Sequence, residues 1–454
     1  MNKKLSFASC LAIGSMLFGL FFGAGNLIFP VYMGQLSGSQ VLMASAGFII
    51  TAVGLPFLGI VAMGISGSGG LFDLASRVHP YYAYGFTVLL YLTIGPMFAL
   101  PRLGTVSFEM GLSPYIPSQL KEVALGIFTI CFFGAALLFA LKPSKILVWV
   151  GKRLNPLFLV FLSFLIIASI VSPMGLYVQS PVHEVYAASA FFKGVTEGYN
   201  TMDALAALAF GIIVVQNIKG LGVQGPKAIA LGTIQSGIVS ILLMCVIYVS
   251  LALMGATSAG IMEPAENGGI ALAQIANYYF GGLGSILLAV IVTLACLKTA
   301  IGLIAACSET FQQMFPRSLS YRAYVIIFTI VSCLVANIGL TQLIALSIPV
   351  LMFLYPLAIV LILLALLSPL FKNRACVYVS ATAFTMLVSL ADGLQAMPEE
   401  IRSAPWARTI LAFYKAHVPF FDLGMGWTIP LLLGTGVGLI IAAATKQRLP
   451  VKHC

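Results

Sequence analysis

Residues 17–30 read LFGLFFGAGNLIFP and interrupt an apolar segment that is long enough to span a bilayer. Glycine inside a helix costs about 1 kcal/mol relative to alanine, so this stretch weakens the helix where hydrocarbon most strongly demands one. Lipid tolerates irregular backbone only where it is buried in protein or lines a wet cavity. We therefore expect a break in a membrane helix over residues 22–26, facing a binding site near the midplane. The residues behind this expectation are Gly19, Gly23, Gly25, Asn26 and Pro30.

A half-helix that starts at Asn26 would direct its positive dipole end and its free N–H groups into this site. Such an end suits an anion, for example a carboxylate. Close packing of helices through small residues is the alternative, since glycine is common in membrane helices. That alternative accounts for Gly19 and Gly23 but explains Asn26 poorly, so the sequence favours a break.

The composition indicates a polytopic membrane protein. Of the 454 residues, 60% are hydrophobic and only 8% are charged, and no soluble domain hides that much apolar surface. The net charge of +10 does not indicate nucleic acid, because most basic residues fall in segments predicted to face the cytoplasm. The eight cysteines form no CxxC pair, so we expect free thiols and no disulfide framework or metal site.

Apolar runs separated by charged or Gly/Pro-rich residues predict twelve spans. With the N-terminus in the cytoplasm, sixteen of the 23 basic residues lie inside and five outside, so we expect both termini to be cytoplasmic. The other two, Arg102 and Lys298, lie within spans. The spans are placed near 8–33, 40–65, 81–110, 122–141, 146–170, 195–218, 227–255, 281–312, 322–338, 341–368, 375–393 and 423–444.

A second break is expected five spans after the first, because many membrane carriers are built from inverted repeats. Span six reads GYNTMDALAALAFGIIVVQNIKG, from residue 198 to residue 220. We place the break in its small-residue-rich middle, 206–211, with Asp203 about one turn to the outside. A continuous helix remains the alternative, since alanine is a good helix former.

Ionisable residues inside spans point to function, since each costs at least about 2.5–3.5 kcal/mol at a helix centre. Arg102 and Asp203 have similar depth in spans three and six, which predicts either a gating ion pair or a static pair. Glu109 is close to an outer end and is either solvated or paired with Arg102. Lys298 sits deep in span eight, and the sequence leaves three interpretations open. It is a fixed cation in place of a metal ion, or a proton carrier, or a lysine that faces a wet crevice and has no role.

The sequence contains no constellation of catalytic groups. Its four histidines are far apart and lack metal-ligand spacing, and there is no phosphate-binding loop. We therefore expect a protein that is not an enzyme and does not couple to ATP hydrolysis.

Five longer stretches resemble the bacterial branched-chain amino acid carrier family of the LIVCS or BrnQ type, within the amino acid-polyamine-organocation superfamily. They follow one another in the order that the family has them, and the likeness runs from about residue 8 to residue 370. The stretches are FFGAGNLIFP, TAVGLPFLGI, GPMFALPRLGTVSFE, GYNTMDALAALAFGIIVV and ANIGLTQLIALSIPVL.

The resemblance implies a secondary symporter that imports leucine, isoleucine and valine across the bacterial cytoplasmic (inner) membrane, generally driven by sodium. It implies no cofactor beyond the coupling ion, which is sodium or a proton. A nearby alternative is a proton-coupled carrier or exchanger of another small neutral amino acid, with Lys298 as the coupling group. A membrane sensor or a channel is more distant.

The resemblance also implies the leucine-transporter type of fold, with five plus five helices in inverted repeat and two C-terminal helices. The first repeat would cover residues 8–170 and the second residues 195–368. The accessory helices would occupy residues 375–444.

The site residues come from short motifs: GAGNLIFP, LAFG and ACLKT resemble motifs of sodium symporters in the superfamily. The sequence departs from these motifs in two places. Lys298 stands where a threonine is expected, which puts sodium coupling in doubt. Span one lacks the usual arginine, which leaves outer gating to Arg102. By similarity, substrate would contact Gly23, Ala24, Gly25, Asn26, Ala207 and Phe210. One cation site would use Asn26 with backbone near Phe21, and a second would use Gly19, Phe22, Ala295 and Thr299.

Overall fold

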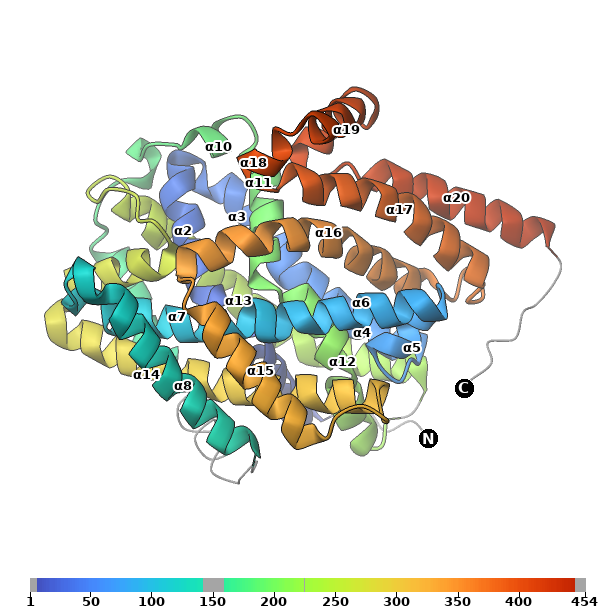
Figure 1. Cartoon of the computed structure of the whole chain (residues 1–454), viewed down its shortest axis with the longest axis horizontal. Helices are drawn as coiled ribbons and strands as arrows, with labels where there is room; N and C mark the ends of the chain where they lie inside the picture. Colours follow the sequence, from blue (N-terminus) through green and yellow to red (C-terminus); the bar gives the residue numbers. More distant parts are fainter. Residues whose placement is uncertain (1–5, 142–158, 224, 446–454) are drawn as a thin grey trace.

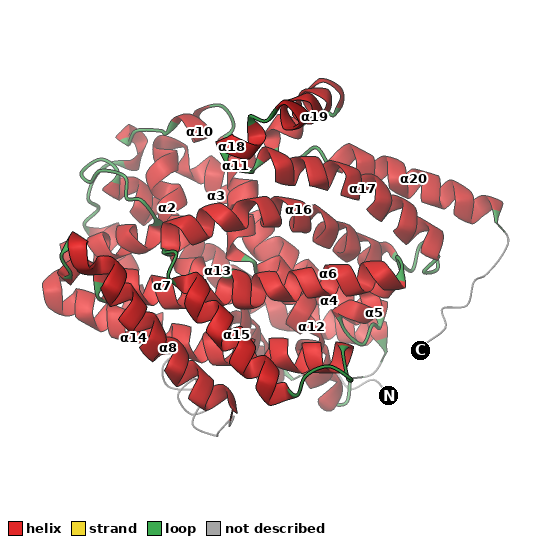
Figure 2. Ribbon diagram, viewed as in Figure 1, coloured by secondary structure: helices red, strands yellow, loops and turns green. Residues whose placement is uncertain are grey.

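The computed structural model describes residues 6–141, 159–223 and 225–445. Within these ranges all regular structure is helical and there is no β-strand (Figures 1 and 2). The earlier helices are α1 (Phe7–Phe21), α2 (Gly25–Ser37), α3 (Val41–Ile49), α4 (Leu55–Ser66), α5 (Leu71–Ser76), α6 (Pro80–Leu92), α7 (Ala99–Gly111), α8 (Lys121–Leu141) and Leu159–Val171. The later helices are α10 (Glu184–Ala187), α11 (Ala190–Glu197), α12 (Asp203–Gly220), α13 (Pro226–Ser258), α14 (Gly268–Met314), α15 (Tyr321–Ala336), α16 (Leu340–Leu367), α17 (Ala375–Gln395), α18 (Glu399–Arg402), α19 (Pro405–His417) and α20 (Thr428–Ala444).

The prediction of an all-α polytopic membrane protein is confirmed. Eight described helical stretches are long and apolar enough to cross a membrane, and four shorter apolar helices accompany them. Each predicted span overlaps one or more of these helices, the fifth only from Leu159 onward. The number of crossings stays a prediction. The orientation also stays a prediction. Some of the basic residues on which it rests lie in 142–158 and 446–454, outside the described residues.

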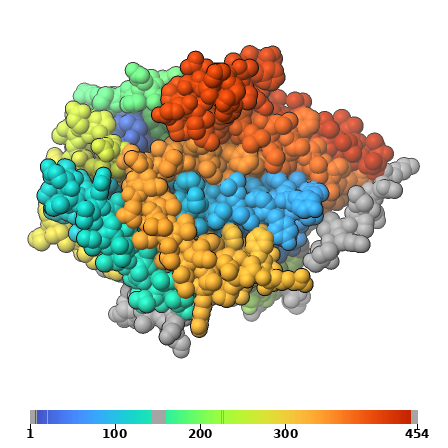
Figure 3. Space-filling model, in the orientation of Figure 1, coloured from blue at the N-terminus to red at the C-terminus, as the bar shows by residue number. Residues whose placement is uncertain are grey.

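The two C-terminal apolar helices lie along one flank. α17 packs against α20, and α16 joins this pair to the remaining helices (Figure 1). In the space-filling view these orange and red segments line one side of the molecule (Figure 3). The flank therefore lies at the periphery, and the assignment of residues 375–444 as accessory helices stays a prediction.

α2 and α13 approach each other until backbone meets backbone. A Cβ added to Gly34 would lie 2.0 Å from the carbonyl oxygen of Ala252, and one added to Gly255 would lie 2.0 Å from that of Val31. Such contacts leave no room for any side chain, so glycine is required at both positions.

α3 and α11 repeat the same arrangement. A Cβ on Gly47 would lie 2.0 Å from the Phe191 carbonyl oxygen, and one on Gly194 would lie 2.0 Å from the Ala44 carbonyl oxygen. The first predicted span thus packs on the seventh, and the sixth on the second. This reciprocity agrees with inverted repeats, whose boundaries stay a prediction.

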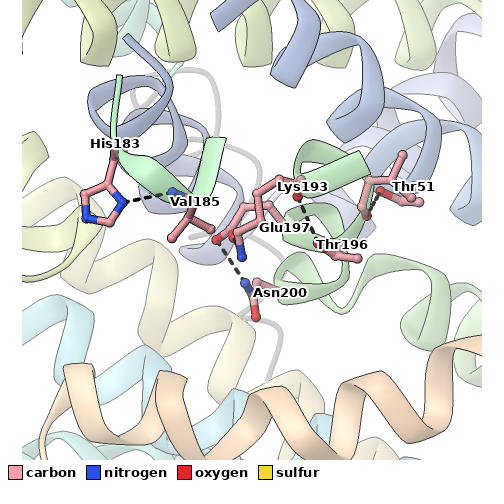
Figure 4. A network of polar contacts seen from close by, with 8 residues as sticks. Thr51, His183, Val185, Lys193, Thr196, Glu197 and Asn200 are labelled. Carbon is pink, nitrogen blue, oxygen red and sulfur yellow. Dashed lines mark hydrogen bonds and ion pairs between the residues drawn. The ribbon is translucent and has the colours of Figure 1, made fainter. Parts of the chain in front are cut away.

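Two spans contain wide turns of π type, which are frequent at functional sites. The first covers Ile50–Gly54 and the second covers Thr93–Met97, where Gly95 leaves helical geometry. In the first turn the Thr51 hydroxyl donates to the carbonyl oxygen of Val195 in α11 at 2.8 Å (Figure 4). The turn therefore fastens the second span to the segment that precedes α12.

The glycine contacts predict a sharp difference between two Gly→Ala substitutions. Gly34→Ala forces α2 and α13 apart and should lower the free energy of unfolding by about 1–3 kcal/mol. Gly85→Ala, on an exposed helical position where a Cβ would meet nothing within 4 Å, should be neutral or slightly stabilising. Thermal unfolding of the purified protein in detergent measures both, and equal midpoints would contradict the proposed close contact.

Candidate functional site

The first span is interrupted where the sequence predicts it. α1 ends at Phe21, Phe22 is extended with φ −75° and ψ 98°, and α2 begins at Gly25. No side chain caps α2, and because the Leu27 and Ile28 N–H groups donate to the Ala24 carbonyl oxygen, the N–H groups suited to an anion are those of Gly25 and Asn26. The Gly23 N–H is already used, since it donates to the Asn26 Oδ1 atom at 3.0 Å.

The predicted position of the second break is wrong. Residues 206–211 are helical within α12, consistent with the strong helix propensity of alanine. The interruption lies earlier, where a single 3₁₀ turn over Gly198–Thr201 is followed by Met202 at φ 61°. α12 then begins at Asp203, whose N–H donates to the Thr201 hydroxyl at 3.3 Å.

Asn26 and Asp203 bring the two interruptions together. The Asn26 Nδ2 atom donates to the Asp203 Oδ2 atom at 2.5 Å and also to the hydroxyl of Tyr248 on α13. Tyr248 Oη lies 3.4 Å from the same carboxyl oxygen. All three side chains are buried. At Gly25 the breaks also approach through backbone, because a Cβ there would lie 3.9 Å from the Thr201 Cα.

A small cavity adjoins the first interruption, and we call it the break cavity. Its volume of about 30 Å³ is enough for one or two water molecules or a small cation. The Thr299 hydroxyl on its wall donates to the Ala295 carbonyl oxygen at 3.0 Å. Its lining residues are Phe18, Gly19, Phe22, Gly23, Ala24, Leu27, Leu159, Val292, Ala295, Cys296, Lys298 and Thr299.

The break cavity gathers part of the site expected from the sequence. Residues predicted for the second cation site line it together with Lys298, whereas Phe21 instead lines a smaller pocket beside Phe57. The roles of these residues stay predictions. Those that share the cavity are Gly19, Phe22, Gly23, Ala24, Ala295, Lys298 and Thr299.

The residues predicted on span six lie elsewhere. Ala207 is buried against α4, where a Cβ on Gly59 would lie 3.0 Å from the Ala207 Cβ. Phe210 lines a larger cavity of about 500 Å³ together with Tyr91 and Glu309. In this structure the predicted substrate contacts of the two broken spans are therefore not gathered around one cavity.

Arg102 and Asp203 have separate partners, so they do not form the expected ion pair here. Buried Arg102 donates from Nη1 to the Asn200 carbonyl oxygen at 2.6 Å and from Nη2 to the Ser347 hydroxyl at 3.1 Å. Its guanidinium also lies 4.9 Å from the centre of the Phe29 ring. Arg102 thus ties the second interruption to α16 rather than to the Asp203 carboxyl.

Two buried polar residues are not among those selected from the sequence. Tyr248 gives little signal, since one tyrosine in an apolar span is common. Asp392 lies inside the predicted span 375–393, where the argument about charges in membranes applies to it as well. Both become visible as candidates through their tertiary surroundings.

Known structures share this arrangement of helices. The fold matches the inward-facing conformation of Mhp1 with a TM-score of 0.60, covering 98% of this chain and 94% of that chain at 14% sequence identity. It matches the Eremococcus coleocola manganese transporter with a TM-score of 0.61, covering 98% and 97% at 15% identity. The fold is therefore that of the leucine-transporter-type membrane transporters.

Sequence comparison identifies the family to which this chain belongs within that fold. Residues 6–445 match the family model described as branched-chain amino acid transport protein. The branched-chain amino acid permease BrnQ of Lactobacillus delbrueckii subsp. lactis is 48% identical, over 99% of this chain and 100% of that protein. BrnQ of Bacillus subtilis is 45% identical, over 97% and 98%. This chain belongs to the branched-chain amino acid transport protein family and is a transporter, not an enzyme.

The hydrogen bonds among Asn26, Asp203 and Tyr248 predict the effect of removing the Tyr248 hydroxyl. Tyr248→Phe keeps the ring but leaves Asn26 with one acceptor fewer, so the initial rate of substrate uptake should fall roughly tenfold. Tyr186→Phe is the matched control, because the buried Tyr186 hydroxyl has no hydrogen-bond partner among the described residues. Uptake into proteoliposomes compares them, and equal rates would remove Tyr248 from the site.

Proposed function

We propose that this chain imports leucine, isoleucine and valine across the bacterial inner membrane by alternating access, coupled to a cation. The observation that carries the proposal is the meeting of both helix interruptions at Asn26 and Asp203. In leucine-transporter-type carriers, interrupted helices offer N–H groups to a substrate carboxylate and carbonyl groups to an ammonium or a cation. The family name and the names of the relatives support the substrate class.

The break cavity supports cation coupling by its size and by its position beside the first interruption. Unwound carbonyl oxygens are suitable ligands for a hard cation, and the cavity adjoins both the interruption and α14. In an apolar pocket one methylene is worth only about 1–3 kcal/mol. We therefore expect weak discrimination among leucine, isoleucine and valine.

Proton coupling is the second candidate, and two observations favour it. Lys298 lies on the wall of the same small cavity, where an ammonium repels a second cation. Asp203 is a buried residue whose hydrogen bonds within the described residues are all with neutral polar side chains. Either group is placed to exchange a proton at the helix breaks.

Asn26→Ala should abolish concentrative leucine uptake. The substitution removes the acceptor of the Gly23 N–H and the donor to Asp203 and Tyr248, so the geometry of both interruptions is lost. Asn337→Ala is the matched control, since its side chain joins α15 to Thr129 of α8 away from the breaks. Near-normal accumulation by a folded Asn26→Ala protein would refute this placement of the site.

Imposed gradients identify the coupling ion. Leucine accumulation in proteoliposomes under a sodium gradient alone would support sodium symport, and accumulation under a proton gradient alone would support the second candidate. If protons drive uptake through Lys298, Lys298→Thr should lose proton dependence and gain sodium dependence. If neither gradient drives leucine uptake, the assignment of leucine as the substrate is contradicted.

A further inference from the structure

The segment that joins α17 to α20 contains a helix that takes no part in the helix breaks. Residues 396–427 form this segment, and α19 is the longest helix in it. By the predicted orientation the segment leaves the outer end of span eleven and returns to span twelve. α19 projects from the flank beyond α17 and α20 (Figures 1 and 3). It therefore lies at the edge of the molecule, near the outer ends of two spans.

One face of α19 packs on the rest of the protein. Ala407 is fully buried and Leu411 is only 6% exposed. Tyr414 donates from its hydroxyl to the Leu387 carbonyl oxygen of α17 at 2.9 Å, and its ring centre lies 5.6 Å from that of Phe421. The three α19 residues follow one another at helical spacing, so they fix the rotation of α19 about its own axis.

A second stripe of α19 is apolar and exposed. Trp406 is 57% exposed, Ile410 is 40% exposed and Phe413 is 58% exposed. Their spacing of four and then three residues places them on one side of the helix, next to the packed face. Arg408 and Lys415 lie on the opposite side at 100° per residue. Water is an unfavourable neighbour for three large apolar side chains, so this stripe needs an apolar covering.

The membrane-facing surface of the flank continues to this stripe. Leu387 and Leu390 on α17 are 63% and 56% exposed, and Leu432 on α20 is 71% exposed. On spanning helices at the periphery, such side chains face lipid, which is as apolar as they are. The Tyr414 hydroxyl joins α19 to α17 at Leu387, whose side chain belongs to this surface. α19 thus lies beside the lipid-covered part of the flank.

A second copy of the chain fits the stripe less well than lipid does. The exposed parts of its three side chains amount to on the order of 300 Å², whereas a stable protein interface needs about 800 Å² from each partner. With 13 residues, α19 is too short to cross a bilayer. Aromatic side chains on one side and basic side chains on the other are typical of a helix that lies in the membrane interface.

We propose that α19 is an interfacial anchor, which inserts Trp406, Ile410 and Phe413 among the headgroups and upper acyl chains of outer-leaflet phospholipids. Lipid then covers the exposed stripe, and the basic side of the helix faces water. The anchor holds the outer ends of both neighbouring spans. α19 is hydrogen-bonded to α17, and Lys415 pairs with Asp422 in the turn before α20 at 3.1 Å.

Tryptophan fluorescence in proteoliposomes tests the proposal. The chain has three tryptophans, so Trp149→Phe combined with Trp427→Phe leaves Trp406 as the reporter. Phosphatidylcholine brominated near the top of its acyl chains should quench the Trp406 emission roughly twofold, and iodide in the buffer should quench it little. Strong quenching by iodide without quenching by the brominated lipid would overturn the proposal.

Cysteine labelling gives a second measurement that keeps every tryptophan. In a background with all eight cysteines replaced by serine, Phe413→Cys places a thiol on the exposed stripe. Ala412→Cys is the matched control, because Ala412 is exposed on the polar side of the same helix turn. A membrane-impermeant maleimide should label Phe413→Cys about tenfold more slowly than Ala412→Cys in proteoliposomes. Equal rates would contradict burial of the stripe in lipid.

Oxidation of the Phe413→Cys variant distinguishes lipid from a second copy of the chain. With lipid on the stripe, copper phenanthroline should leave the protein monomeric on non-reducing electrophoresis. A disulfide-linked dimer that forms at low protein-to-lipid ratio, together with a Trp406 emission that brominated lipid does not quench, would assign the stripe to a second copy and overturn the proposal.

Discussion

The hydrogen bond from Asn26 to Asp203 holds the centre of this structure together. A bilayer supplies no water to backbone groups, so every interruption of a spanning helix must be satisfied by the protein itself. The Asn26 amide does this at the first interruption, where its oxygen accepts from the Gly23 N–H, and its nitrogen joins that interruption to the second by donating to the Asp203 carboxyl group. Tyr248 adds a third helix to the same contact.

Glycine contacts keep the interrupted spans in place around that bond. α2, which follows the first interruption, lies at backbone distance from α13 through Gly34 and Gly255. α11, which precedes the second interruption, lies equally close to α3 through Gly47 and Gly194. α2 and α11 are thus each supported by a helix from the other half of the chain.

Arg102, Lys298 and Asp392 occupy three separate environments within the predicted spans. Arg102 donates hydrogen bonds to the Asn200 carbonyl oxygen and to the Ser347 hydroxyl, and so fixes the second interruption against α16. Lys298 lies on the wall of the break cavity beside Thr299, and Asp392 is buried in α17 with no hydrogen-bond partner for its carboxyl group within the described residues. Because charges in hydrocarbon are expensive, each of these positions is a candidate for a functional role, and the roles stay predictions.

The sequence predicted the helical class, the approximate spans and the first interruption, because each depends on local properties. Runs of apolar residues set the spans, and glycines beside Asn26 weaken one helix wherever it packs. The same reasoning does not hold in span six, where the small residues predict a weak helix although alanine stabilises one. The polar turn over Gly198–Thr201 and the left-handed Met202 carry the interruption instead.

Only the tertiary structure decided which polar groups meet. Asn26, Asp203 and Tyr248 are far apart in the chain, and a hydrogen bond between them depends on how three helices pack. The same holds for Arg102, which shares its predicted depth with Asp203 but reaches Asn200 and Ser347. Depth in a span follows from sequence position, whereas the direction of a side chain and its partner follow from helix rotation and packing.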